Sequence, residues 1–160
     1  VDMHLTGIHT DPVMVILHRA DLRLAEEEDW CQQQFAIWGE DRVSTTRHLG
    51  GRIYHRKYRG HGHKSYCLIG ATGLGMNSNK RPTQMARKYL WLALPKSAKR
   101  VKDPDGCDDY MQSLVEFNDA NETNFDGIKA VIRRALKLRE DDLLASGEYE
   151  GHAHQSIASS

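Results

Sequence analysis

The stretch TNFDGIKAVIRRALKLR, residues 123–139, carries the clearest structural pattern in the chain. Its apolar residues recur three or four positions apart, which is the spacing that places side chains on one face of an α-helix. Thr123 and Asp126 resemble a capping box at the start of this helix. We therefore predict an amphipathic helix whose apolar stripe consists of Phe125, Ile128, Val131, Ile132, Ala135 and Leu136.

Two further segments near the C-terminus have a helical pattern. Residues 108–117, DDYMQSLVEF, are predicted as one helix. Residues 140–146, EDDLLAS, are predicted as a short third turn that ends before Gly147, because acidic side chains at 140–142 suit the start of a helix. The last ten residues, 151–160, are small and polar, and we expect a flexible tail there.

The first forty residues are harder to interpret. Residues 11–18, DPVMVILH, begin with a turn signal and continue as an apolar run, which predicts a buried strand. Over residues 22–38 the apolar positions have helical spacing and favour a helix, although QFAIW, residues 34–38, also fits a short strand. The opening residues, 1–7, lack the basic start and apolar core of a secretory signal.

The middle of the chain predicts a small antiparallel sheet. RIYHRKY, residues 52–58, alternates basic and aromatic side chains with period two, and KSYCLIG, residues 64–70, follows in hairpin position. Residues 83–94, TQMARKYLWLAL, are ambiguous; we expect a helix from Pro82 or Thr83 that gives way to a strand near Tyr89. The predicted class is α+β: one domain over 1–150, with a basic hairpin or small sheet packed against two or three C-terminal helices.

Charge is segregated along the chain although the formal net charge is zero. Residues 1–41 contain nine acidic and two basic residues, and residues 103–160 contain thirteen acidic and five basic ones. Residues 42–102, which we call the basic block, contain fifteen Lys and Arg and no Asp or Glu. Pairing between these segments is one explanation, but surface ion pairs stabilise a fold only weakly. A field of one sign attracts phosphates, so we favour binding to a polyanion.

The basic block also supplies the predicted contact residues. Lys and Arg neutralise phosphates, and Tyr rings offer flat faces on which unpaired bases stack. A charged edge strand that prevents aggregation is the alternative explanation. The predicted nucleic-acid-binding residues are Arg52, Tyr54, Arg56, Lys57, Tyr58, Arg59, Lys64, Lys80, Arg81, Arg87 and Lys88.

Other motifs give weaker signals. GATGLGMN, residues 70–77, has a Gly-x-x-Gly-x-Gly arrangement, but without a βαβ unit or a later acidic residue it favours a flexible loop over a nucleotide site. His61 and His63, with His152 and His154, would supply four nitrogen ligands, yet nine histidines make such pairs unsurprising. We predict no metal or other cofactor. His61 and His63 would also serve as acid and base in metal-independent RNA cleavage, with Lys64 stabilising the phosphate.

The chain has three cysteines, Cys31, Cys67 and Cys107, whose spacing fits neither a metal site nor a disulfide framework. This predicts buried thiols in a reducing compartment: cytoplasm, nucleus, organelle matrix or virion. No apolar run has the length needed to cross a bilayer, and no membrane partner is expected. The sequence thus predicts a non-enzymatic nucleic-acid-binding protein, RNA favoured over DNA, in a ribonucleoprotein or other assembly with possible protein partners. The alternatives are a metal-independent ribonuclease that uses His61 and His63 and a module that docks an acidic protein.

Overall fold

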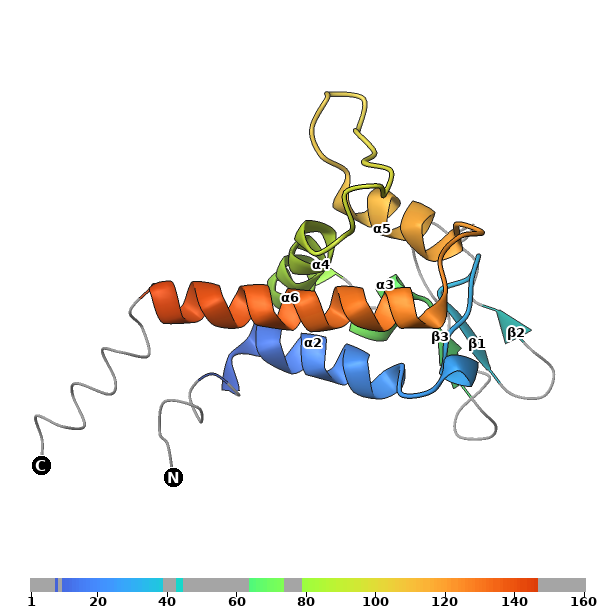
Figure 1. Ribbon diagram of the computed structural model, residues 1–160, viewed down its shortest axis with the longest axis horizontal. Coiled ribbons are helices and arrows are strands. Elements are labelled where there is room, and N and C mark those ends of the chain that lie inside the picture. The colour runs from blue at the N-terminus through green and yellow to red at the C-terminus, as the bar shows by residue number, and fades with distance from the viewer. Residues whose placement is uncertain (1–7, 9, 39–42, 45–63, 74–78, 147–160) are drawn as a thin grey trace, which may run out of the picture.

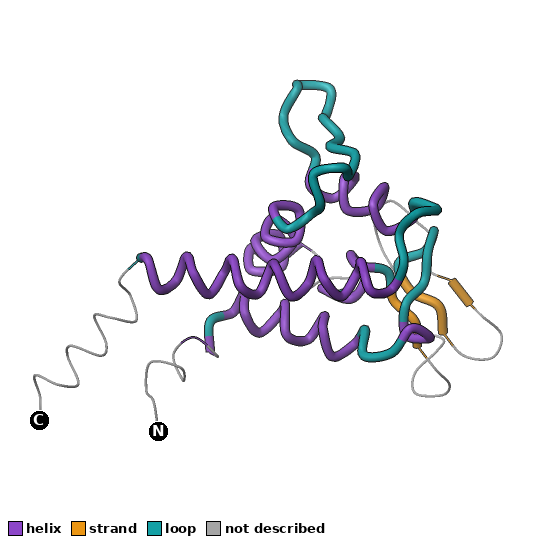
Figure 2. The backbone as a smooth tube through the Cα atoms, viewed as in Figure 1, coloured by secondary structure: helices purple, strands orange, loops and turns teal. Residues whose placement is uncertain are grey.

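The computed structural model describes residues 8, 10–38, 43–44, 64–73 and 79–146, and they form an α+β fold (Figure 1). Helices dominate, and the short strands lie together at one end of the helical body (Figure 2). The elements in chain order are α2 (Pro12–Arg23), η1 (Glu27–Asp29), β1 (Ala36–Trp38), β2 (Val43–Ser44), β3 (Lys64–Tyr66), α3 (Leu68–Thr72), α4 (Arg81–Leu92), α5 (Tyr110–Asp119) and α6 (Phe125–Ala145).

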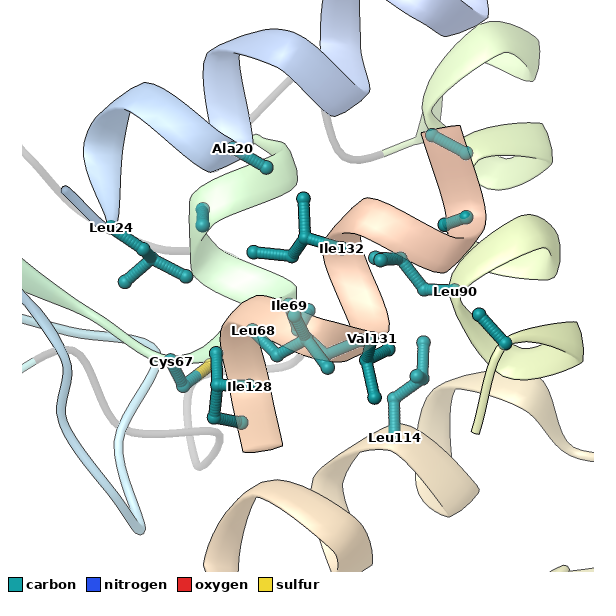
Figure 3. Packing of buried hydrophobic residues seen from close by; sticks show 14 of the residues in the cluster. Ala20, Leu24, Cys67, Leu68, Ile69, Leu90, Leu114, Ile128, Val131 and Ile132 are labelled. Carbon is teal, nitrogen blue, oxygen red and sulfur yellow. The ribbon is translucent and has the colours of Figure 1, made fainter. Parts of the chain in front are cut away.

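Helix α6 is the centre of the core. Its predicted apolar stripe is confirmed: Ile128, Val131, Ile132 and Ala135 are fully buried, and Phe125 and Leu136 pack at the margin. Figure 3 shows Ile128, Val131 and Ile132 of α6 among Leu24 at the end of α2, Leu68 of α3, Leu90 of α4 and Leu114 of α5. Each fully buried aliphatic side chain contributes about 1.5–3 kcal/mol.

The ends of α6 differ from the prediction. Asn124 caps the helix, because its side-chain oxygen accepts a hydrogen bond from the Gly127 backbone N–H at 2.8 Å. The Thr123 hydroxyl instead donates to the Phe117 carbonyl at 2.6 Å and ties α6 to α5. Residues 140–145 do not begin a separate turn; they continue α6 without a break. Glu140 to Asp142 therefore lie in the last part of a helix, where the dipole does not favour them.

Residues 12–23 form helix α2, so the predicted strand over residues 11–18 is wrong. The Asp11 carboxylate accepts a hydrogen bond from the Met14 N–H at 3.0 Å, and Pro12 starts the helix with its preset φ angle. The buried residues Val13, Leu17, Ala20 and Leu24 then follow at helical spacing. The predicted helix over 22–38 is also wrong, since α2 ends at Arg23 and only the short η1 follows before a strand.

The described strands form one sheet in the order β2-β1-β3, with both pairs antiparallel. Residues 36–38 are thus a strand, which was the alternative for QFAIW. Strand β3 pairs with β1 in the register Ala36↔Tyr66, Ile37↔Ser65 and Trp38↔Lys64. The predicted second strand ends early, because Cys67 caps α3 and Leu68 onward is helical. Residues 52–58 lie outside the described residues, so their pairing stays a prediction.

Helices α4 and α5 complete the body. Residues 81–92 are helical throughout, and the predicted change to a strand near Tyr89 is wrong, because Ala86, Tyr89, Leu90 and Ala93 bury one helical face. The predicted helix over 108–117 is confirmed as α5, which Asp109 caps through the Gln112 N–H at 2.9 Å. Between them, residues 95–109 form a loop that extends away from the helices, drawn at the top of Figure 1.

Candidate nucleic-acid interface

Helix α4 presents basic side chains to solvent. Because one face of α4 packs in the core, the opposite face is exposed to solvent. The exposed face carries Arg81 and Lys88, and Lys80 is the N-cap residue. Arg81 and Lys88 are seven positions apart, which is two helical turns or about 10 Å along the axis. Both side chains therefore extend from the same side of α4.

The loop after α4 continues this charge. Lys96, Lys99, Arg100 and Lys102 are all exposed. Arg100 is held in place, because its guanidinium lies 4.5 Å from the centre of the Trp91 ring and donates to the Trp91 carbonyl at 2.6 Å. Lys102 is paired with Asp108. The loop thus combines one anchored arginine with lysines that extend into solvent.

Most described cations of the basic block from Lys80 onward form no ion pair with another described residue. The described ion pairs are Lys102–Asp108, Lys129–Asp21, Lys137–Asp141 and Arg139–Asp11, and only the first includes a residue of the block. Within the residues that the structure describes, no acidic side chain pairs with Lys80, Arg81, Lys88, Lys96 or Lys99. Pairing between segments therefore does not account for the charge segregation in this part of the molecule.

Among the predicted contact residues, Arg87 requires a correction. It is only 6% exposed, and its guanidinium donates to the Thr72 hydroxyl at 3.0 Å and to the Gly73 carbonyl at 3.1 Å. Its charge therefore holds α4 against the end of α3 and does not face a partner. The glycine motif is divided in the same region, because Gly70 belongs to α3 and Gly73 is its C-cap.

The other predicted residues of the hairpin are placed only in part. Lys64 is the first residue of β3, and its backbone pairs with Trp38. The remaining predicted residues lie outside the described part of the chain: Arg52, Tyr54, Arg56, Lys57, Tyr58 and Arg59, with the alternative catalytic pair His61 and His63.

Asn118, near the end of α5, joins three segments that are distant in sequence. It is 1% exposed, and its side-chain oxygen accepts hydrogen bonds from the Trp30 indole N–H and the Leu68 backbone N–H, both at 2.9 Å. Its amide nitrogen donates to the Cys31 carbonyl at 3.0 Å and to Asp119 at 2.9 Å. The Asn118 side chain and these partner groups therefore form hydrogen bonds with each other in place of hydrogen bonds to water. Sequence analysis missed this residue, because nothing in the motif EFND distinguishes it from an ordinary helix end.

Asp119 extends this arrangement to the surface. Its carboxylate accepts the Gln33 backbone N–H at 2.7 Å, and Gln33 has a φ of 66°, in the left-handed region. The Gln32 side chain donates to the Asn118 and Ala120 carbonyls at 2.9 and 3.2 Å. Residues 30–33 are thus held against the end of α5 by side chains on both sides.

A pocket of about 560 Å³ lies beside Asp119. Its walls are Pro95 and residues 97–99 of the loop after α4, the end of α5, the connection that follows it, and the N-terminal part of α6. Pro95, Ala98, Phe117, Ala120 and Ala130 provide apolar surface. The charged residues that line it are Lys99, Glu116, Asp119, Glu122 and Arg134.

The cysteines are all free thiols. Cys31 and Cys67 are buried as predicted, whereas Cys107 is exposed. Burial raises the pKa of Cys31 to about 12 and the pKa of Cys67 to about 11. Both thiols therefore stay protonated at neutral pH, which makes them poor nucleophiles and poor metal ligands.

The described residues contain no group of three or more His, Cys, Asp or Glu side chains arranged to hold a metal ion. Within the same ranges, no helix combines the length and apolar character needed to cross a membrane.

The fold and surface define a small α+β protein with a helical core and a basic surface on α4 and the loop after it, where Lys80, Arg81, Lys88, Lys96 and Lys99 have no acidic partner among the described residues. The chain belongs to the family of unknown function DUF6197, which it matches over residues 9–138. No curated protein and no solved structure matches it significantly.

Proposed function

We propose that this protein binds nucleic acid through the basic block, with RNA favoured over DNA. One observation carries the proposal: Lys80, Arg81, Lys88, Lys96 and Lys99 are exposed and have no acidic partner among the described residues. Unpaired cations on one continuous stretch of chain attract phosphates, and their binding releases the counterions condensed on the nucleic acid.

The preference for RNA rests on the sequence of residues 52–58, where tyrosines alternate with basic residues. Such a pattern suits the stacking of unpaired bases better than insertion into a duplex groove. The three free thiols are consistent with a reducing compartment, so we place the protein inside the cell or in a virion, as a component of a ribonucleoprotein or other assembly.

The test is a fluorescence-anisotropy titration with single-stranded RNA, single-stranded DNA and duplex DNA at two salt concentrations, in EDTA. We expect affinity to fall steeply with salt. The double variant Arg81→Gln/Lys88→Gln should reduce the slope of log affinity against log salt by about 1.4–1.8, because each lost phosphate contact contributes roughly 0.7–0.9. Lys137→Gln is the control for losing one exposed lysine outside the basic block, since Lys137 belongs to α6 and already pairs with Asp141.

Other outcomes would assign other functions. A probe that is cut in EDTA, with cutting lost in His61→Ala or His63→Ala, would support the metal-independent ribonuclease. If no probe binds at physiological salt, the proposal fails, and the basic block would have to serve an acidic protein partner.

A further inference from the structure

The pocket beside Asp119 adjoins the basic block, and the role that we infer for it rests on the proposed nucleic-acid binding. Its volume of about 560 Å³ lies within the range of small-molecule sites, roughly 300–1,000 Å³. Pro95 and residues 97–99 form one of its walls and belong to the basic block, as does the neighbouring Lys96. A strand whose phosphates contact Lys96 and Lys99 would therefore carry its bases past this pocket.

The charges that line the pocket argue against a phosphate inside it. Two cations, Lys99 and Arg134, are outnumbered by three carboxylates, those of Glu116, Asp119 and Glu122. A phosphate would be repelled by the carboxylates, whereas a neutral group that donates hydrogen bonds would be attracted to them. The apolar walls, Phe117 among them, suit a flat ring.

The carboxylates retain unused hydrogen-bonding capacity. Asp119 accepts from Gln33 and Asn118 through the single oxygen Oδ1, and Glu116 accepts from Gln112 through Oε1 at 3.1 Å. Within the described ranges, no hydrogen-bond donor reaches Asp119 Oδ2 or Glu116 Oε2. The Glu122 carboxylate likewise accepts no hydrogen bond from a described residue. The pocket thus offers several acceptors to an incoming donor.

We propose that this pocket binds one unpaired nucleobase of the bound strand and prefers guanine. The Watson–Crick edge of guanine presents two adjacent donors, N1–H and the N2 amino group, which match the two oxygens of a carboxylate. Uracil presents a single N–H between two carbonyl oxygens, and the carboxylates would repel those oxygens. Lys99 and Arg134 are then available to the flanking phosphates.

The experiment compares two fluorescein-labelled RNA decamers, one of uridine alone and one with a single central guanosine. We expect the wild-type protein to bind the guanosine-containing decamer about tenfold more tightly, the effect of one bidentate base contact. The variant Glu116→Gln/Glu122→Gln should lose this preference. Glu27→Gln/Glu140→Gln is the matched control: it removes the same charge from carboxylates that do not line the pocket, and it should keep the preference.

The outcomes separate this inference from the proposed function. Equal affinity of the wild-type protein for the two decamers would overturn the base pocket and leave nucleic-acid binding intact. A preference that persists in Glu116→Gln/Glu122→Gln, with circular dichroism showing a folded protein, would also overturn it. If neither decamer binds, the proposed function itself fails, and the pocket inference fails with it.

Discussion

Replacement of Asn118 by alanine should be the most destabilising polar substitution in the described part of the chain. The change removes four side-chain hydrogen bonds. It leaves the Trp30 indole N–H, the Leu68 N–H and the Cys31 carbonyl without the Asn118 side chain, which is 1% exposed. An unsatisfied buried polar group costs about 1–3 kcal/mol, so three such groups amount to at least roughly 3 kcal/mol. That is a large fraction of the 5–15 kcal/mol, roughly, by which domains are stable.

Equilibrium unfolding in urea, followed by tryptophan fluorescence, measures this loss. The midpoint should fall while the slope of the free energy against urea stays constant, because the surface exposed on unfolding is unchanged. Asn121→Ala is the matched control, since Asn121 is exposed in the turn after α5 and should change stability by less than about 0.5 kcal/mol. A loss below about 1 kcal/mol for Asn118→Ala would refute the view that this amide holds the three segments together.

Two further predictions concern the ion pair of Asp11 with Arg139 and the accessibility of the cysteine thiols. Burial alone would raise the pKa of Asp11, but hydrogen bonds from Arg139 and the Met14 N–H, with the Arg139 charge, hold it below its ordinary value. The stability that Asp11 contributes should therefore be present at neutral pH and lost as pH falls below about 4. Asp11→Ala should lower the free energy of unfolding by about 2–4 kcal/mol at pH 7. In urea unfolding at a series of pH values, the variant should also show a smaller loss of stability at acidic pH than the wild-type protein. An Ellman assay of the native protein at pH 8 should detect one fast thiol, the exposed Cys107, and three in guanidinium chloride; two or more fast thiols in the native protein would contradict the burial of Cys31 and Cys67.

Local periodicity decided which elements could be predicted from the sequence. Helix α6 was predictable because its apolar residues follow one face over several turns. Helix α2 was less predictable, because the apolar run 13–17 has the pattern of a buried strand, whereas Asp11 and Pro12 before it are a strong helix-start signal.

The site was less predictable, because its features depend on contacts between distant residues. Charge segregation identified the exposed cations of the basic block. It could not show that Arg87 turns inward to Thr72 and Gly73, since that depends on how α4 packs against α3. The pocket and the Asn118 arrangement join segments whose proximity no local pattern encodes.

The hydrogen bonds of Asn118 also bear on the order in which the protein folds. They join residues 87 and 88 positions apart in the chain, whereas α4, α5 and α6 are consecutive and are joined by the shorter connections 93–109 and 120–124. Closing the longer loop costs more chain entropy, so residues 30–33 should dock after the three helices have associated. The hydrogen bonds of the Asn118 amide then form after the folding transition state, and their loss should accelerate unfolding far more than it slows refolding.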